Sequence, residues 1–155
     1  MRGPESAIPG RDMMKGMPAI FLSYAGKDRE IAQSVGRELS KAGFRVWDQA
    51  LEILPGADWA AEISSALRSA EAMLVFISPD FMASDYVSRD IQYALGAKHL
   101  RDRLIPIVIR PTKDMPWILN SLTPLKYEDP RKTGQQVIQL LNHPANVSKA
   151  KHRAS

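Results

Sequence analysis

Asp90 is the residue of this 155-residue chain whose surroundings point most directly to chemistry. An apolar run typical of a buried strand, Met73–Ile77, ends before a short loop, and Ser84 or Asp85 then marks the start of a helix. Asp90 lies one turn into that helix, and Tyr86, four residues earlier, shares its face. A carboxylate held near the carboxyl end of a buried strand is well placed for ligand chemistry in an open α/β sheet.

Polar residues also close the first two apolar runs. Ser23 and Tyr24 end the first expected strand, and Asp48 follows the second. The carboxyl ends of parallel strands meet at one edge of a sheet, so we expect Ser23 and Tyr24 to border the same crevice as Asp90. Asp48 is a second polar group expected at that edge.

The elements that must position these residues alternate along the chain. Strands are expected at 19–24, 44–47, 72–77, 104–109 and 125–127. Helices are expected to begin at Asp28 or a neighbour, at Asp58 and at Ser84 or Asp85, with a last one over 133–141, and Gly43 is expected to end the first. Pro106 favours an edge strand or a strand start for 104–109.

Strands that are apolar throughout predict a parallel sheet covered on both faces. The expected fold is therefore a single flavodoxin-like, doubly wound α/β domain of about five mostly parallel strands, with helices on both faces. We place this domain at 18–144, between a disordered leader at 1–17 and a disordered basic tail at 145–155.

Composition restricts the class of protein. The chain has no cysteine, which excludes disulfides and thiolate metal sites, and its three scattered histidines argue against a metal triad, so neither a metal nor a bound cofactor is expected. No apolar run approaches the ~20 residues of a membrane span. These features predict a cytoplasmic protein that does not enter a membrane. The sequence also lacks the glycine patterns of P-loop and dinucleotide-binding enzymes.

The net charge of +4 does not by itself predict a nucleic-acid-binding protein. Of the 21 basic and 17 acidic residues, residues 1–18 hold three and two, and the tail from residue 145 holds three basic residues and no acid. The expected folded body is therefore neutral, whereas a duplex-binding domain carries a basic face on its body. This distribution argues against nucleic acid as a partner.

Three separate segments, in order, resemble the signature of the TIR (Toll/interleukin-1 receptor) domain family, in its bacterial type. They are Phe21-Leu22-Ser23-Tyr24 with Lys27-Asp28; Val46-Trp47-Asp48 followed by Leu54-Pro55-Gly56-Ala57-Asp58-Trp59, like the family's BB loop and next helix; and Ser78-Pro79 through Asp90. Together they cover roughly residues 19–141. The family's late Phe-Trp box is not evident, and Trp117 is the nearest candidate.

The resemblance implies one of two functions. Some members cleave the N-glycosidic bond of NAD+, releasing nicotinamide and ADP-ribose or a cyclic variant, often in antiphage defence or host cell death. Others are adaptors that act only through TIR–TIR contacts. The enzymatic members generally assemble as well, because the BB loop of one copy helps to complete the site of another. NAD+ as substrate and other TIR domains as partners are thus implied.

The resemblance also implies roles for particular residues. Asp90 matches the catalytic acid, which is usually glutamate, and Tyr86 matches an aromatic position one turn earlier. Ser23, Tyr24 and Asp48 are implied to join Tyr86 around the substrate. Within the BB loop, taken as Gln49–Asp58, the implied interface residues are Leu51, Ile53, Leu54, Pro55 and Gly56.

The chemistry needs only one acid. Breaking a ribosyl–nicotinamide bond passes through an oxocarbenium-like state, and nicotinamide leaves neutral, so a carboxylate that stabilises positive charge is the main requirement. Aspartate, however, shortens the reach of glutamate by about 1.5 Å. Because a misplacement of ~1 Å can cost ~10²-fold in rate, a non-catalytic adaptor is the competing hypothesis.

Each candidate residue also has a purely structural interpretation. Asp90 is equally consistent with a solvated acid that complements its helix dipole. Tyr86 could serve packing, and Asp48 could shape the loop that follows it. Trp59 fits a core anchor of its helix, and Trp47 fits either a buried or a half-exposed position.

Overall fold

Five strands form one parallel sheet. The computed structural model describes residues 19–48, 50, 56, 58–83, 85–97, 100, 103–113, 115, 117–122 and 124–142, and for residues 59, 82, 85–90 and 118 the description covers the backbone alone. The strands are β1 (Ala19–Ser23), β2 (Arg45–Trp47), β3 (Ala72–Ile77), β4 (Leu104–Val108) and β5 (Leu125–Lys126). Their order is β2-β1-β3-β4-β5, and every neighbouring pair is parallel. This is the flavodoxin-like order, so the predicted fold class is confirmed.

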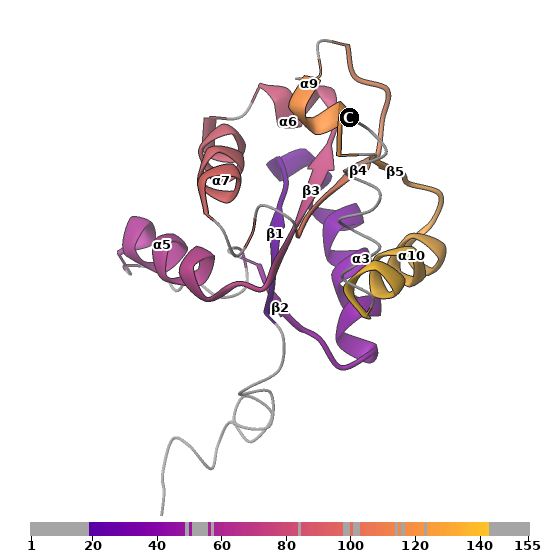
Figure 1. Ribbon diagram of the computed structural model, residues 1–155, viewed down its shortest axis with the longest axis horizontal. Coiled ribbons are helices and arrows are strands. Elements are labelled where there is room, and N and C mark those ends of the chain that lie inside the picture. Colours follow the sequence, from indigo (N-terminus) through magenta and orange to yellow (C-terminus); the bar gives the residue numbers. More distant parts are fainter. Residues whose placement is uncertain are drawn as a thin grey trace, which may run out of the picture.

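Four long helices cover the two faces of the sheet (Figure 1). Helices α3 (Arg29–Lys41) and α10 (Pro130–Asn142) lie on one face, and α5 (Trp59–Ser69) and α7 (Asp85–Gly96) lie on the other. Three short helices complete the described elements: η1 (Gly26–Asp28), α6 (Pro79–Met82) and α9 (Trp117–Asn120).

Two apolar clusters, one on each face, explain why the strands are apolar throughout. Successive side chains of a strand point to opposite faces, so β1 and β3 supply both clusters. Met73, Val75 and Ile77 pack toward α5 and α7, while Ala72, Leu74 and Phe76 pack toward α3 and α10. All six residues of β3 are buried, which makes β3 the centre of the core.

Local signals account for the helix ends that the sequence predicted. Gly43 has φ +99°, and the N–H groups of Gly43 and Phe44 donate to the carbonyls of Ser40 and Leu39 at 3.0 and 3.1 Å, which is a Schellman end to α3. The carboxylate of Asp58 accepts from the N–H of Ala61 at 3.2 Å and caps α5.

One helix start differs from the prediction. Helix α10 begins at Pro130 rather than Thr133, because the carboxylate of Asp129 caps it by accepting from Lys132 N–H at 2.8 Å, and proline suits the first helical position. Helix α3 begins at Arg29, directly after the N-cap residue Asp28, as predicted, although the Asp28 side chain makes no capping hydrogen bond.

The prediction for Pro106 was wrong about the sheet edge. Strand β4 lies between β3 and β5, so it is an internal strand. The N–H of Ile109 donates to β3, and Pro106, three residues before it, points its nitrogen toward the other side. There, the pairing with β5 begins only at Ile107, so the missing N–H of Pro106 removes no hydrogen bond of the described ladder.

The connection after Ser78, which was expected to be a short loop, holds α6. Helix α9 lies in the connection between β4 and β5, for which no helix was predicted. The predicted leader and basic tail lie outside the described residues. Within the described part of the chain, no helix is long and apolar enough to cross a membrane.

Gly134 marks the closest approach of α3 and α10. A Cβ added at Gly134 would lie 2.7 Å from the Cβ of Glu38, which cannot move without its backbone. We predict that Gly134→Ala lowers the free energy of unfolding by about 1–3 kcal/mol, measured by urea denaturation, because the two helices must separate.

The matched control for that change is Gly96→Ala in α7. A Cβ there would meet nothing within 4 Å, so this variant should be as stable as the wild type or more stable. A Gly134→Ala variant with unchanged stability would contradict the close helix contact.

Candidate functional site

The topology identifies one edge of the sheet as the place for a site. The connection from β1 leads outward through α3 to β2, whereas the chain then returns through α5, on the other face, to β3. The strand order therefore reverses between β1 and β3. Ligands of open α/β sheets bind outside the carboxyl ends of the strands at such a switch point.

A buried carboxylate lies at this switch point. The side chain of Asp28, in the loop after β1, is 0% exposed. One of its oxygens, Oδ2, accepts a hydrogen bond from Ser78 Oγ, just after β3, at 2.5 Å. The other, Oδ1, accepts from the guanidinium of Arg110, which follows β4. The loops after three neighbouring strands are thus joined through one carboxylate.

The cluster continues outward through weaker ion pairs. Arg110 Nη2 also lies 3.3 Å from a carboxylate oxygen of Asp80, and Lys27 Nζ lies 3.7 Å from the other oxygen of Asp80. The side chains of Arg110, Asp80 and Lys27 are 42%, 39% and 80% exposed. Exposed pairs of this kind contribute little, so the energetic weight of the cluster rests on Asp28 and its two direct partners.

A second cluster occupies the carboxyl ends of β1 and β2, on the α3 face. Asp48 is buried, and its Oδ1 accepts from Tyr24 Oη at 2.5 Å and from the backbone N–H of Ala50 at 3.0 Å. Its Oδ2 accepts from Gln33 Nε2 at 2.9 Å. Three of the roughly four acceptor positions of this carboxylate are therefore filled by neutral donors.

Burial raises the pKa of Tyr24 well above its ordinary value, and its hydrogen bond to Asp48 and the negative charge of Asp48 raise it further. The positive charge of Arg29 opposes this shift only in part. Tyr24 therefore stays protonated and keeps donating to Asp48 throughout the physiological range.

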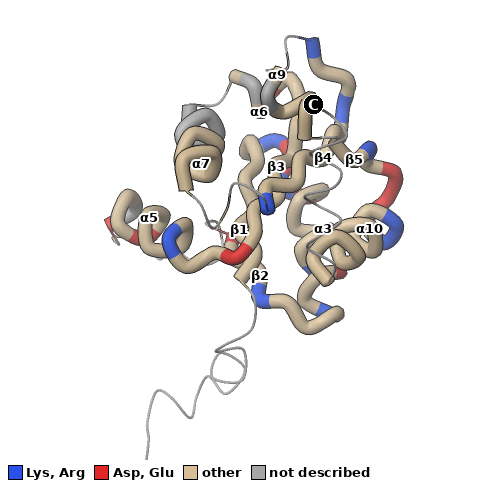
Figure 2. Tube along the Cα trace, viewed as in Figure 1, with Lys and Arg blue, Asp and Glu red and all other residues tan. Residues whose placement is uncertain are grey.

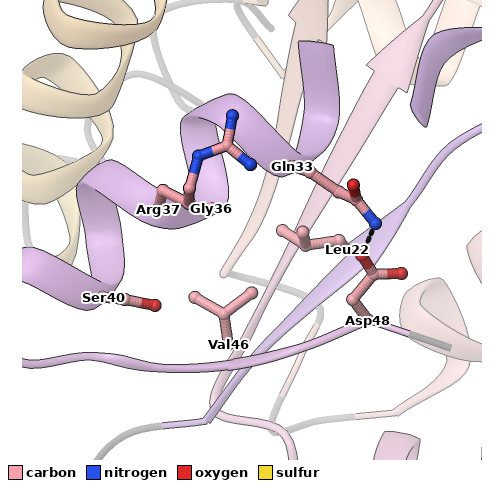
Figure 3. A pocket seen from close by; sticks show the side chains of 7 residues that line it. All are labelled: Leu22, Gln33, Gly36, Arg37, Ser40, Val46 and Asp48. Carbon is pink, nitrogen blue, oxygen red and sulfur yellow. Dashed lines mark hydrogen bonds between the residues drawn. The ribbon is translucent and has the colours of Figure 1, made fainter. Parts of the chain in front are cut away.

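An open pocket of about 290 Å³ lies beside the Asp48 cluster, between α3 and strands β1 and β2 (Figure 3). Leu22, Gly36 and Val46 give it an apolar floor, and the polar side chains around it are Gln33, Arg37, Ser40 and Asp48. Its size is at the lower end of the range for small-molecule sites. Among the described residues, no group of three His, Cys, Asp or Glu side chains could hold a metal ion.

The sequence was compared with models of known protein families. The TIR domain family model matches residues 20–141. The chain belongs to the TIR domain family. The family resemblance predicted from the sequence motifs is therefore confirmed, over nearly the span that those motifs covered.

Solved structures agree with the fold of this TIR domain. It is similar to the crystal structure of the TIR domain of the Toll-related receptor TRR-2 from Hydra magnipapillata, with a TM-score of 0.63 at 24% identity over 83% of this chain and 97% of that one. A weaker likeness, on which no argument rests, is to a diflavin flavoprotein A3 from Nostoc sp., with a TM-score of 0.43 at 13% identity over 82% and 97%. Among proteins with curated descriptions, none matched in sequence.

The residues predicted for the substrate site of the TIR domain fall on both faces of the sheet. Ser23 is buried and alternates with Leu22 and Tyr24, so it faces the side of α5 and α7. The ring of Tyr24 packs in the apolar core on the side of α3 and α10, and its hydroxyl donates to Asp48. Asp90 and Tyr86 lie in α7, but their side chains lie outside the described residues.

Most of the predicted interface also lies outside the described residues, namely Leu51, Ile53, Leu54 and Pro55. Gly56 is described as an exposed turn residue with φ +85°. Trp47 is half-buried, which is the second of its two predicted positions, and it stacks on Phe21 with ring centroids 4.8 Å apart. Trp117 lies on α9 and is 77% exposed.

Sequence reasoning missed the Asp28 cluster. Asp28 was taken as a possible helix start, Ser78 as the residue after the third strand and both as parts of family motifs, and Arg110 was not considered. The Ser78-Pro79 pair does carry a signal, since a capping serine followed by proline marks a helix start. No local pattern, however, reveals a contact between residues 82 positions apart in the sequence.

Tyr24→Phe should lower the free energy of unfolding by about 1.5–3 kcal/mol at pH 7, because it removes a hydrogen bond to a buried carboxylate. The pKa of Tyr24 is raised on folding, so its contribution is complete below pH 10, the ordinary value, and is lost as the pH rises further. Urea denaturation from pH 7 to 11 should therefore show a difference between wild type and variant that narrows above pH 10.

Tyr93→Phe is the matched control, since Tyr93 is an exposed tyrosine on α7. Its effect should stay within about 0.5 kcal/mol. A difference between wild type and Tyr24→Phe that is the same at every pH would contradict the assigned role of the hydroxyl.

Proposed function

We propose that this TIR domain cleaves NAD+ at the ribosyl–nicotinamide bond when copies assemble, with Asp90 as the catalytic carboxylate. The observation that carries the proposal is the position of helix α7, which follows β3 at the carboxyl edge of the sheet, in a family of which some members cleave NAD+. The products are nicotinamide and ADP-ribose or its cyclic variant, and the setting is defence or cell-death signalling.

The chemistry asks for little beyond one carboxylate. As the glycosidic bond lengthens, positive charge develops on the ribose, and an acid beside the ring stabilises that charge and accepts hydrogen bonds from the ribose hydroxyls. Nicotinamide departs as a neutral molecule and needs no proton donor. No metal and no bound cofactor enter the proposed reaction, in which NAD+ is the substrate.

The substrate residues in this proposal are Ser23, Tyr24, Asp48 and Tyr86. Ser23 lies on the same face of the sheet as α7, at the end of β1. Tyr24 and Asp48 hold each other at the neighbouring strand ends, and Asp48 also holds the backbone at Ala50, where the loop after β2 begins. An extended dinucleotide that crosses the edge of the sheet can contact residues from both faces.

Assembly is the second part of the proposal. Other TIR domains are the proposed partners, and the proposed contact is the BB loop, through Leu51, Ile53, Leu54, Pro55 and Gly56. The proposed location is the cytoplasm, away from membranes and nucleic acid. Basic and acidic residues are interspersed over the described body in this view, which favours a protein partner over a polyanion (Figure 2).

One observation favours a non-catalytic adaptor as the second candidate. Aspartate stands at position 90, where enzymatic members usually have glutamate, and the shorter side chain loses about 1.5 Å of reach. In that case assembly through the BB loop is the whole function. Both candidates require assembly, so only a measurement of NAD+ cleavage separates them.

The test is nicotinamide release from NAD+ at high protein concentration, with assembly forced by crowding or by fusion to an oligomer. We predict release by the wild type. Asp90→Glu should raise the rate by up to about 100-fold, because the longer side chain recovers the lost reach. Asp90→Asn should lower it by about 100-fold or more, because an amide cannot stabilise the developing charge.

Glu62→Gln is the matched control, since Glu62 is an exposed acid on α5 and its loss should leave the rate unchanged. Release that is absent from the assembled wild type would contradict cleavage and leave the adaptor function.

A further inference from the structure

We infer that Asp28 is a positioning residue: its buried carboxylate fixes Ser78, and through Ser78 it fixes helix α6 and the start of helix α7. In this scheme Asp28 acts through Ser78 and does not touch the reacting atoms. Its effect on the reaction rests on the proposed function, because α7 is the helix that carries Asp90. Its effect on α6 does not depend on any activity.

The hydroxyl of Ser78 both donates and accepts a hydrogen bond. It donates its proton to Asp28 Oδ2 at 2.5 Å, and its oxygen accepts from the N–H of Phe81 at 3.1 Å. Serine has one hydroxyl proton, so the bond to Asp28 sets the rotation of the hydroxyl and leaves the lone pairs free for Phe81. Ser78 is fully buried, so its hydroxyl has no access to bulk water that could replace Asp28 as its partner.

The charge of Asp28 matters as well as its shape. A hydrogen bond to an ionised acceptor is shorter and about twice as strong as a neutral one. Arg110 compensates the charge of Asp28 from the far side and holds the second oxygen. In an Asp28→Asn variant, the amide has a single acceptor oxygen, so it cannot accept from both Ser78 and Arg110, and it carries no charge.

Helix α6 depends on this anchor because it is only four residues long. A helix of that length is not stable by itself, and its position is set by its cap and by packing. The cap is Ser78, and the packing comes from Phe81, which is buried in the cluster that faces α5 and α7. Helix α6 also contacts β3 and α7.

Movement of α6 reaches α7 directly. Only two residues separate the end of α6 at Met82 from the start of α7 at Asp85, and the two helices are in contact. A shift of ~1 Å in a reacting group can cost ~10²-fold in rate. Aspartate at position 90 makes this constraint stricter, since a short side chain has fewer rotamers with which to correct a displaced backbone.

The experiment compares Asp28→Asn and Ser78→Ala with Asp80→Asn, which removes the exposed carboxylate of the same cluster and keeps the Asp28–Ser78 bond. Hydrogen exchange is followed at the amides of α6 and of the first turn of α7, with the amides of α10 as an internal reference. NAD+ cleavage is measured on the same full-length, assembled proteins, well below the melting temperature of each.

We expect exchange in α6 and at the start of α7 to be at least about tenfold faster in Asp28→Asn and Ser78→Ala, with α10 and the Asp80→Asn variant unchanged. The same two variants should lose about tenfold or more in kcat while KM stays within about twofold, because the binding of NAD+ is retained and the acid is misplaced.

Two results would overturn the inference. Wild-type exchange in α6 and α7 in both variants, or acceleration of equal size in α10, would show that Asp28 does not act on this segment in particular. Faster local exchange with unchanged kcat would remove its link to the reaction. If the wild type releases no nicotinamide, the proposed function fails, and the exchange measurement still decides the positioning of α6 and α7.

Discussion

The loops after β1, β3 and β4 are joined at the carboxyl edge of the sheet by one buried charge, that of Asp28. Asp28 is fully buried, and a carboxylate in that environment is tolerated only when its oxygens are filled and its charge is compensated. Ser78 and Arg110 meet both needs, and they come from the loops after β3 and β4. The strands of the core are apolar and pack without specifying the loops. The Asp28 carboxylate therefore determines how those loops are arranged around the switch point.

Two polar clusters at this edge hold different loops. The Asp28 cluster ties the loops after β1, β3 and β4, on the way to the helix that carries Asp90. The Asp48 cluster ties the ends of β1 and β2 to α3 and to the first described residue of the loop after β2. In the proposed enzyme, the first cluster sets the position of the acid, and the second sets the loop through which copies assemble.

The sequence predicted those features that local patterns determine. Strand β3 was placed residue for residue, because a strand buried on both faces is apolar at every position, and Gly43 and Asp58 gave true helix ends. Pro106 led to a wrong prediction of an edge strand. Strand β4 is internal, but β5 pairs with it only from Ile107 onward, so the missing N–H of Pro106 has no partner to lose on that side. In the site, Tyr24 and Asp48 were chosen singly, and the structure adds that they bond to each other. Asp28, Ser78 and Arg110 were missed as a group, because only the assembled sheet brings them together.

The most direct test of this account is a double-mutant cycle between Asp28 and Arg110, read as the free energy of unfolding from urea denaturation. Asp28→Asn, Arg110→Met and the double variant form the cycle, and Asp80→Asn with Arg110→Met forms the reference cycle. The account predicts a coupling free energy of about 1–3 kcal/mol for the buried pair and less than about 1 kcal/mol for the half-exposed one. Additivity of Asp28→Asn and Arg110→Met to within about 0.5 kcal/mol would contradict it, because the buried carboxylate would then not depend on its cation.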